Sequence, residues 1–290
     1  MVNVAAVGDS SRWVLVDTGI PGYAESIRRA AETRFGSGTR PAAIVLTHGH
    51  FDHVGSLVEL LETWDVPVFA HRLELPYLTG RSSYPPPDPL VGRGSMSLLS
   101  RFYPRGPIDI SGRVETLPSD GTVPELTGWQ WIHSPGHTPG HTSLFRESDR
   151  CLVAGDALTT TRQESFNAVL TQRCELHGPP AYFTQDWSSA RDSVRRLAAL
   201  APDTLLAGHG RPMHGEEMRE RLYALAARFD ERERPRYGRY AAQAAVADDS
   251  GTLILPPDPL PKVLAGAGAA AAALGVIWIA TTARKRARAA

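Results

Sequence analysis

A dense group of histidines directly after an apolar run is the feature that most constrains this chain. Residues 42–46, Ala-Ala-Ile-Val-Leu, are typical of a buried strand, and residues 47–53 read Thr-His-Gly-His-Phe-Asp-His. Side chains alternate along an extended segment, so His48, His50 and Asp52 share one direction. Imidazole and carboxylate groups are good ligands for zinc, iron or manganese. The segment therefore predicts a metal site at the end of a strand.

Three further segments carry similar side chains directly after apolar runs. They follow residues 129–133, 151–154 and 204–207, and their candidate ligands are His137, His141, Asp156 and His209. Strand ends deliver such residues to one rim, whereas unrelated loop histidines would have no reason to recur in this position. Strands that alternate with helical patterns, such as those at 23–35 and 186–200, indicate an α/β layered domain.

Composition excludes several other classes of protein. The chain has 290 residues, 42% of them apolar, which is enough to bury a full core. Residues 1–261 hold 26 basic and 31 acidic side chains, a net charge of −5, so no nucleic-acid partner is expected. The two cysteines, Cys151 and Cys174, cannot make a disulfide framework.

Together these segments resemble the metallo-β-lactamase superfamily, in its hydrolase branch with the His-x-His-x-Asp-His signature, which includes glyoxalase II-like and lactonase-like enzymes. The resemblance covers about residues 1–230 and includes the Asp-Thr-Gly motif at 17–19. It implies an αββα sandwich with the site along one edge of the two sheets. Ahead of Val2 the family's first strand is not recognisable, so this chain is expected to lack it.

The resemblance also implies a role for each ligand candidate. It assigns three histidines to a first metal, three residues to a second and one aspartate to a bridge between them: His48, His50 and His137; Asp52, His53 and His209; and Asp156. The implied cofactors are two divalent ions, zinc in the first place, with iron or manganese as alternatives. A hydroxide between the ions would be the nucleophile, and Asp52 is expected to take the proton that the water releases.

Other residues are expected to support the ligands or to contact the substrate. The resemblance places His141 and Asp17 where they would orient metal ligands without binding the ions. The irregular segment 76–112, with Tyr84, and the segment with His177 and Tyr182 are expected to border the metals and contact the substrate. The alternative is that both are surface segments away from the site.

The residues after Asp156 separate this chain from well-known branches of the family. Glyoxalase II and persulfide dioxygenases have a Gly-Cys-Gly-Arg-like segment there, and acyl-homoserine lactonases have a tyrosine where this chain has Thr159. A hydrolase of a small-molecule ester, thioester or lactone is therefore predicted, with its substrate open. The alternatives are an iron-dependent oxygenase or oxidoreductase resembling persulfide dioxygenases, and a binding module without catalysis, which the complete set of ligand positions disfavours.

The end of the chain has a different character. Residues 231–261 are charged and then proline-rich, as in a linker, and residues 262–290 are expected to form a transmembrane helix and a basic tail. Val263 to Ala283 is 21 residues long without a charge, close to the ~20 needed to cross a bilayer. Since the start has no signal peptide, a single-pass membrane protein with a cytoplasmic catalytic domain is predicted. The alternatives are a soluble alanine-rich helix or a flexible tail.

Oligomerisation is a further open expectation for this segment. Small residues recur four positions apart, as at Gly266 and Ala270, and would let two such helices approach closely. The alanine-rich composition makes this spacing nearly unavoidable. A homodimer is therefore named as an alternative to a monomer.

Overall fold

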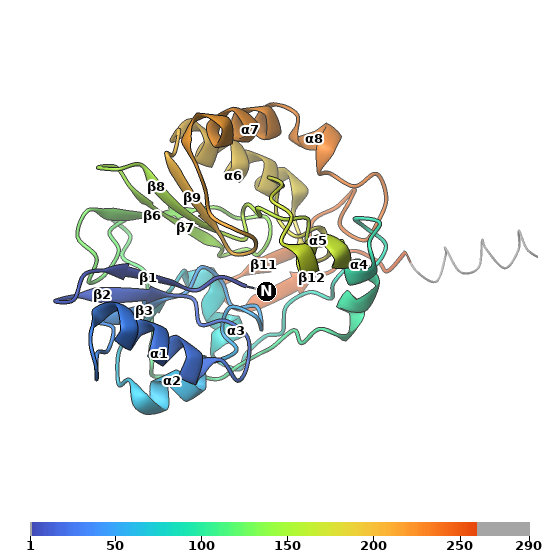
Figure 1. Ribbon diagram of the computed structural model, residues 1–290. Coiled ribbons are helices and arrows are strands. Elements are labelled where there is room, and N and C mark those ends of the chain that lie inside the picture. Colours follow the sequence, from blue (N-terminus) through green and yellow to red (C-terminus); the bar gives the residue numbers. More distant parts are fainter. Residues whose placement is uncertain (1, 260–290) are drawn as a thin grey trace, which may run out of the picture. The chain divides into compact units, whose positions relative to one another are not determined.

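Two five-stranded sheets face one another in the computed structural model, which describes residues 2–259 (Figure 1). In spatial order the first sheet consists of β1 (Ala5–Gly8), β2 (Trp13–Val16), β3 (Ala43–Val45), β4 (Val68–Ala70) and β5 (Val114–Thr116). The second consists of β10 (Met213–His214), β9 (Thr204–Ala207), β8 (Cys151–Gly155), β7 (Thr142–Arg146) and β6 (Trp129–His133). Strands β2 to β5 run parallel, as do β8 and β9. The other neighbours in these sheets are antiparallel.

Helices cover the outer face of each sheet. The first sheet is covered by α1 (Ala24–Phe35) and α2 (Leu57–Thr63), and the second by α6 (Trp187–Ala199) and α7 (Gly215–Ala227) (Figure 1). The expected αββα order of layers is confirmed. Short helical segments lie in the connections: η1 (Arg72–Glu74), α3 (Leu75–Leu78), α4 (Ser95–Leu99), η2 (Ser100–Phe102), α5 (Phe166–Thr171), η3 (Ala181–Phe183) and α8 (Phe229–Arg232).

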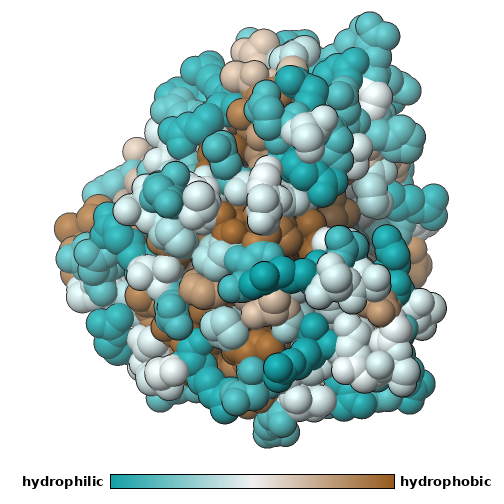
Figure 2. Space-filling view, turned by 90° about the vertical axis from the view of Figure 1, so that its left-hand side faces the viewer, coloured by the Kyte–Doolittle hydropathy of each residue, from teal (hydrophilic) through white to brown (hydrophobic). Residues whose placement is uncertain are grey.

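Alternation along the strands divides the apolar side chains between the layers. In β2, Trp13 and Leu15 pack with the helices of the first layer, while Val14 and Val16 pack between the sheets with residues such as Leu144. Figure 2 shows apolar residues gathered mainly across the middle of one face of the molecule, beneath a largely hydrophilic upper part. The central strands β2, β3 and most of β8 are buried, so packing on both sides fixes the position of their ends.

Contacts divide the chain into two units, residues 1–255 and 256–290. The first unit contains part of the segment expected as a linker, because β11 (Val246–Asp248) and β12 (Gly251–Ile254) form a hairpin within it. In this hairpin Thr252 contacts the hydroxyl of Tyr77 at 3.1 Å and donates its N–H to Ser82 at the same distance. The domain boundaries expected at residues 230 and 261 stay a prediction.

The structure corrects the expectation of a membrane anchor. Within residues 2–259, none of the helices has the length and apolar character needed to cross a membrane. The segment on which the expectation rested, Val263 to Ala283, lies outside the described residues, and so do the small residues named for a homodimer. The transmembrane helix, the membrane as a partner and the membrane localisation are therefore not supported.

Replacing Trp13 by alanine should strongly destabilise the domain. Trp13 is 1% exposed, stacks on Phe35 at 4.9 Å and meets the edge of Trp64 at 5.7 Å. We expect the free energy of unfolding in urea to fall by about 3–5 kcal/mol, because the cavity would be large. Tyr223→Ala, at a side chain that is 47% exposed, is the control and should change it by less than about 0.5 kcal/mol. Equal losses in both variants would contradict this packing.

Candidate metal centre

Strand ends bring the candidate ligands to one edge of the sandwich. The segment 46–53 follows β3, Asp156 follows β8, and His209 lies just after β9. Since β8 and β9 are parallel, their carboxyl ends lie at the same edge. His137 comes from the loop between β6 and β7. Where this loop ends, the Thr142 N–H donates a hydrogen bond to the carbonyl of Thr47, just after β3 of the first sheet. Both sheets therefore contribute to one site.

Three histidines form the first cluster. The rings of His48, His50 and His137 are buried, and one ligand atom from each lies within 4.8 Å of the others. His50 Nδ1 and His137 Nε2 are 3.0 Å apart. A hydrogen bond between these two nitrogens uses one proton and one lone pair. A metal ion beside both nitrogens would instead accept the lone pair of each. This three-histidine cluster is thus a set of donors suited to a metal ion.

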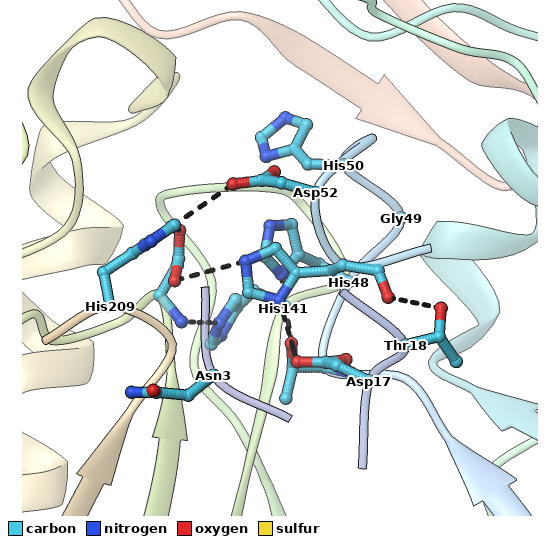
Figure 3. A network of polar contacts seen from close by, with 12 residues as sticks. Asn3, Asp17, Thr18, His48, Gly49, His50, Asp52, His141 and His209 are labelled. Carbon is cyan, nitrogen blue, oxygen red and sulfur yellow. Dashed lines mark hydrogen bonds and ion pairs between the residues drawn. The ribbon is translucent and has the colours of Figure 1, made fainter. Parts of the chain in front are cut away.

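Asp52, His53 and His209 form the second cluster. His209 Nε2 lies 3.4 Å from Asp52 Oδ2, and Figure 3 shows these side chains pointing toward one another. Asp156 lies beside both clusters: its Oδ2 is 3.2 Å from His209 Nε2 and 3.5 Å from His137 Nε2. The structure thus brings all seven ligand candidates together, with Asp156 in the place expected for a bridge.

Asp17 and Thr47 fix which ring nitrogen of two histidines carries a proton. Asp17 Oδ2 lies 2.8 Å from His53 Nδ1, which therefore donates and leaves Nε2 with its lone pair. The Thr47 hydroxyl donates to the same Asp17 oxygen at 2.7 Å and so accepts from His48 Nδ1 at 3.1 Å. His48 is left with a free lone pair on Nε2. The expected orienting role of Asp17 agrees with these contacts.

His141 is held by hydrogen bonds at both ring nitrogens. Its Nε2 accepts the backbone N–H of Asp156 at 2.9 Å, so Nδ1 carries the proton and donates to the Ser134 hydroxyl at 2.9 Å. Ser134 in turn donates to the Ser143 hydroxyl, which donates to the Ala154 carbonyl. With neither nitrogen left over, His141 positions Asp156 and is not itself placed to bind a metal.

Burial keeps the three-histidine cluster neutral. It lowers the pKa of His48 and His137 well below the ordinary value, and neighbouring histidines lower both further. Burial also lowers the pKa of His50 to about 4. A neutral imidazole is the form that binds a metal, so these residues are in the required state at neutral pH.

The second cluster has the opposite electrostatics because carboxylates surround it. Burial alone would lower the pKa of His53, but Asp156 and then Asp17 outweigh it and raise this pKa well above the ordinary value. His209 likewise has its pKa raised to about 10, chiefly by Asp156. Asp52 would have a raised pKa through burial, but His209 lowers it to about 2. Without a metal, these carboxylates favour the protonated rings of His53 and His209, and an ion would take the place of the second proton of each ring.

Buried side-chain atoms without a hydrogen-bond partner gather in these two clusters. Within the described residues they include His48 Nε2, His50 Nε2, His53 Nε2, His137 Nδ1 and Asp156 Oδ1. Buried polar atoms are normally paired, so such a group needs an explanation. For His48 and His53 the unpartnered nitrogen is the one that the outward hydrogen bond leaves with its lone pair. The donor set fits divalent metal ions.

Aromatic residues form one side of the centre. Phe183 stacks on His50 at 4.5 Å between ring centroids, and Tyr103 packs against both Phe51 and Phe183. Tyr182 belongs to the same apolar group, and its pKa is raised well above the ordinary value by burial and then by the charge of Asp52. The segment around Tyr182 therefore lies beside the candidate ligand His50, and its contact with a substrate stays a prediction.

The other two candidate substrate residues lie elsewhere. Tyr84 is buried behind His50, with ring centroids 4.4 Å apart, and its hydroxyl binds Glu74. His177 is between Glu175 and Glu233, at 3.7 and 3.5 Å, and lines a cavity of about 500 Å³ to which none of the seven ligand candidates contributes. Tyr84 thus supports His50 from behind, and His177 lies in a separate cavity.

Several supporting residues have no recognisable signal in the sequence. Thr47 and Ser134 lie inside the motifs but are ordinary loop residues by pattern. Glu74 lies in η1, 21 residues after His53, and nothing about its surroundings in the sequence distinguishes it from a surface glutamate. Only the fold, which buries it between two ligand loops, reveals its contacts.

A family model for the metallo-β-lactamase superfamily matches residues 1–209. The chain belongs to this superfamily. It is 53% identical over 217 residues to the probable metallo-hydrolase YflN of Bacillus subtilis, covering 75% of this chain and 82% of that protein. A hydroxyacylglutathione hydrolase of Xanthomonas axonopodis is 28% identical over 207 residues, 71% of this chain and 59% of that protein.

Solved structures agree with this membership at the level of the fold. A metallo-β-lactamase family protein from Thermus thermophilus aligns with a TM-score of 0.53 and 22% identity, over 80% of this chain and 75% of that one. The predicted superfamily is confirmed. Its members and the two clusters of histidines and aspartates support a metal-dependent hydrolase.

Replacing Asp156 by alanine should reduce the metal content of the purified protein. The variant removes the carboxylate beside both clusters, so we expect the loss of at least one ion per chain, measured by elemental analysis. Asp149→Ala, at an exposed carboxylate that pairs with Arg146, should keep the wild-type metal content. A folded Asp156→Ala protein with unchanged metal content would argue against a bridging role.

Metal binding should release protons at neutral pH. Below a pH of about 10 His209 holds a proton in the metal-free protein, and an ion binds only the deprotonated ring. Lower pH favours the protonated ring, so metal affinity should fall from pH 8 to pH 6. Calorimetric titrations in two buffers of different ionisation enthalpy would count the protons released. An affinity that is independent of pH would contradict this reasoning.

Proposed function

We propose that this protein is a hydrolase that uses two divalent metal ions, zinc in the first place, to cleave an ester, thioester or lactone in a small molecule. One observation above all supports the proposal: seven buried or nearly buried histidines and aspartates lie together, and Asp156 groups with His48 of the first cluster and His53 of the second. A purely structural role would not require so many unpartnered donor atoms at one place.

Each cluster would hold one ion. His48, His50 and His137 would bind the first, Asp52, His53 and His209 the second, and Asp156 would contact both. When bound, a pair of divalent ions lowers the pKa of a coordinated water and polarises the carbonyl group of a substrate. The charges favour this arrangement, because two aspartates partly balance the ions and leave a positive centre that stabilises a developing oxyanion.

Asp52 is our candidate for the proton acceptor. Its side chain is 18% exposed, against 3% for Asp156, so it lies at the open side of the site where substrate and water would arrive. Its pKa of about 2 keeps it ionised at neutral pH. Asp52 would accept the proton of the attacking water and then return it to the leaving group.

The aromatic side of the centre favours a substrate with an apolar part next to the scissile bond. Phe183 lies against His50, and Tyr103 and Tyr182 pack beside it. The phenol of Tyr182, kept neutral by burial, would donate a hydrogen bond to the substrate.

A hydrolysis screen on protein of known metal content tests the proposal. Ester, thioester, lactone and phosphodiester substrates would be assayed with metal-loaded and chelated protein. We expect cleavage of one of the first three classes, lost with chelator and regained with added metal. Asp52→Asn, measured at a metal concentration that restores the wild-type content, should lower the rate by about 10²–10⁴-fold.

Asp65→Asn is the matched control, because Asp65 is 88% exposed and pairs with Arg113 outside the metal centre; its rate should match the wild type. Iron in the purified protein together with oxygen uptake and no hydrolysis would overturn the proposal. Wild-type turnover by the Asp52→Asn variant would overturn only the role of Asp52 as proton acceptor.

A further inference from the structure

Glu74 is a fully buried carboxylate outside the set of ligand candidates. It closes η1, has no exposed surface, and is bonded by four groups that can all donate a hydrogen. Its Oε2 accepts from the Gly49 N–H at 3.0 Å and from the Tyr84 hydroxyl. Its Oε1 accepts from the Thr138 hydroxyl and the Gly140 N–H, both at 2.8 Å. One side chain thus joins three separate parts of the chain.

These partners lie next to the three histidines of the first cluster. Gly49 is the residue between His48 and His50, and Thr138 directly follows His137. The two loops that supply the cluster are therefore bound to opposite oxygens of the same carboxylate. The four hydrogen bonds of Glu74 go to none of the residues of the second cluster.

Tyr84 extends the same contact to the ring of His50. The tyrosine ring packs on His50 with 4.4 Å between centroids, and Tyr77 stacks on its other face at 3.9 Å. The Gly49 N–H also reaches the Tyr84 hydroxyl at 2.9 Å. Glu74 thereby fixes both the backbone beside His50 and the aromatic ring against which its imidazole rests.

Both glycines at this contact are required by the close approach. A Cβ atom added at Gly140 would lie 2.8 Å from Cγ of Glu74, and one added at Gly49 would lie 2.7 Å from the Tyr84 hydroxyl oxygen. Separations this short do not occur without movement of a neighbour. The loop with Gly140 therefore packs directly on Glu74, and the loop with Gly49 packs directly on its partner Tyr84.

We propose that Glu74 is a positioning residue that holds the three-histidine cluster in the geometry that binds its metal ion. This inference rests on the proposed metal centre and adds to it a residue that contacts no metal. Residues that support metal ligands in this way typically change metal affinity by about 10–100-fold when they are replaced.

Glu74→Gln is the sharpest test, because glutamine has the same shape but only one acceptor oxygen. Each oxygen of Glu74 faces a backbone N–H, one from Gly49 and one from Gly140, and an N–H cannot accept. In either orientation the amide nitrogen of glutamine would therefore face a donor. One ligand loop must move away, whichever way the amide turns.

Zn²⁺ alone, in competition with a chromophoric chelator, is the probe. If wild-type protein binds two ions, Glu74→Gln should bind one with unchanged affinity and the other about 10–100-fold more weakly. The absorption spectrum of the Co²⁺-loaded variant should change, since the three-histidine environment is altered. Glu62→Gln, at an exposed glutamate of α2, is the matched control and should bind like the wild type.

The outcomes separate this inference from the proposed function. Wild-type protein that binds no metal would overturn the metal centre itself. Wild-type protein with two ions and a Glu74→Gln variant with the same two affinities and the same Co²⁺ spectrum would overturn only the role of Glu74. A variant whose metal-free form is less stable but whose metal affinities are unchanged would also overturn it, because Glu74 would then serve the fold alone.

A second variant covers the case in which Glu74→Gln does not fold. The double variant Tyr84→Phe and Thr138→Val removes the two hydroxyl donors, retains the ring on His50 and leaves both backbone bonds to Glu74. We expect it to bind the first ion several-fold more weakly than the wild type. Unchanged affinity in this folded double variant would overturn the proposal.

Discussion

The structure depends on keeping many histidines and aspartates buried side by side. Taking such groups out of water is costly unless each is paired or binds a cation. Hydrogen bonds from residues around the two clusters meet this requirement. Asp17 bonds Nδ1 of His53, the Thr47 hydroxyl bonds Nδ1 of His48, and the Ser134 hydroxyl bonds Nδ1 of His141. Asp17 and Thr47 thereby satisfy Nδ1 of His53 and of His48, and Nε2 of each of these two rings is left without a partner. The same hydrogen bonds that make burial tolerable also concentrate the lone pairs at one place.

The sandwich makes this concentration possible because its strands end at a common edge. Apolar residues on both faces of the sheets fix the register, so the residues after β3, β8 and β9 cannot slide away from one another. The end of the described chain adds to this support. Thr252 in β12 contacts Tyr77, which stacks on Tyr84, which in turn packs on His50. A hairpin beyond the residues matched by the family thus braces a candidate metal ligand.

The sequence was informative wherever local rules decide the outcome. The alternation of strand and helix patterns was enough to predict α/β layers, and the position after apolar runs was enough to predict that His48, His137 and His209 lie at one rim. The αββα order of the layers came from the resemblance to the superfamily. Glu74 was missed because its environment is created by loops from residues 49, 84, 138 and 140, which no local pattern relates to it. The same reason explains Tyr84: the proline-rich stretch around it suggested a substrate loop, but long-range packing places its ring behind His50. His177 follows the loop after Asp156 in sequence yet lies between Glu175 and Glu233.

One fixed donor settles the direction of each hydrogen bond in the chain that runs from the Asp156 N–H through His141 to Ala154. The Asp156 backbone N–H can only donate, so His141 must accept at Nε2 and carry its proton at Nδ1. Ser134 must then pass its own proton toward Ser143, which ends the chain at the Ala154 carbonyl in the strand that precedes Asp156. No member of this chain can change its protonation without breaking one of these hydrogen bonds. Asp156 is thus held in place before any metal arrives, and preorganisation of this kind reduces the ordering cost of binding.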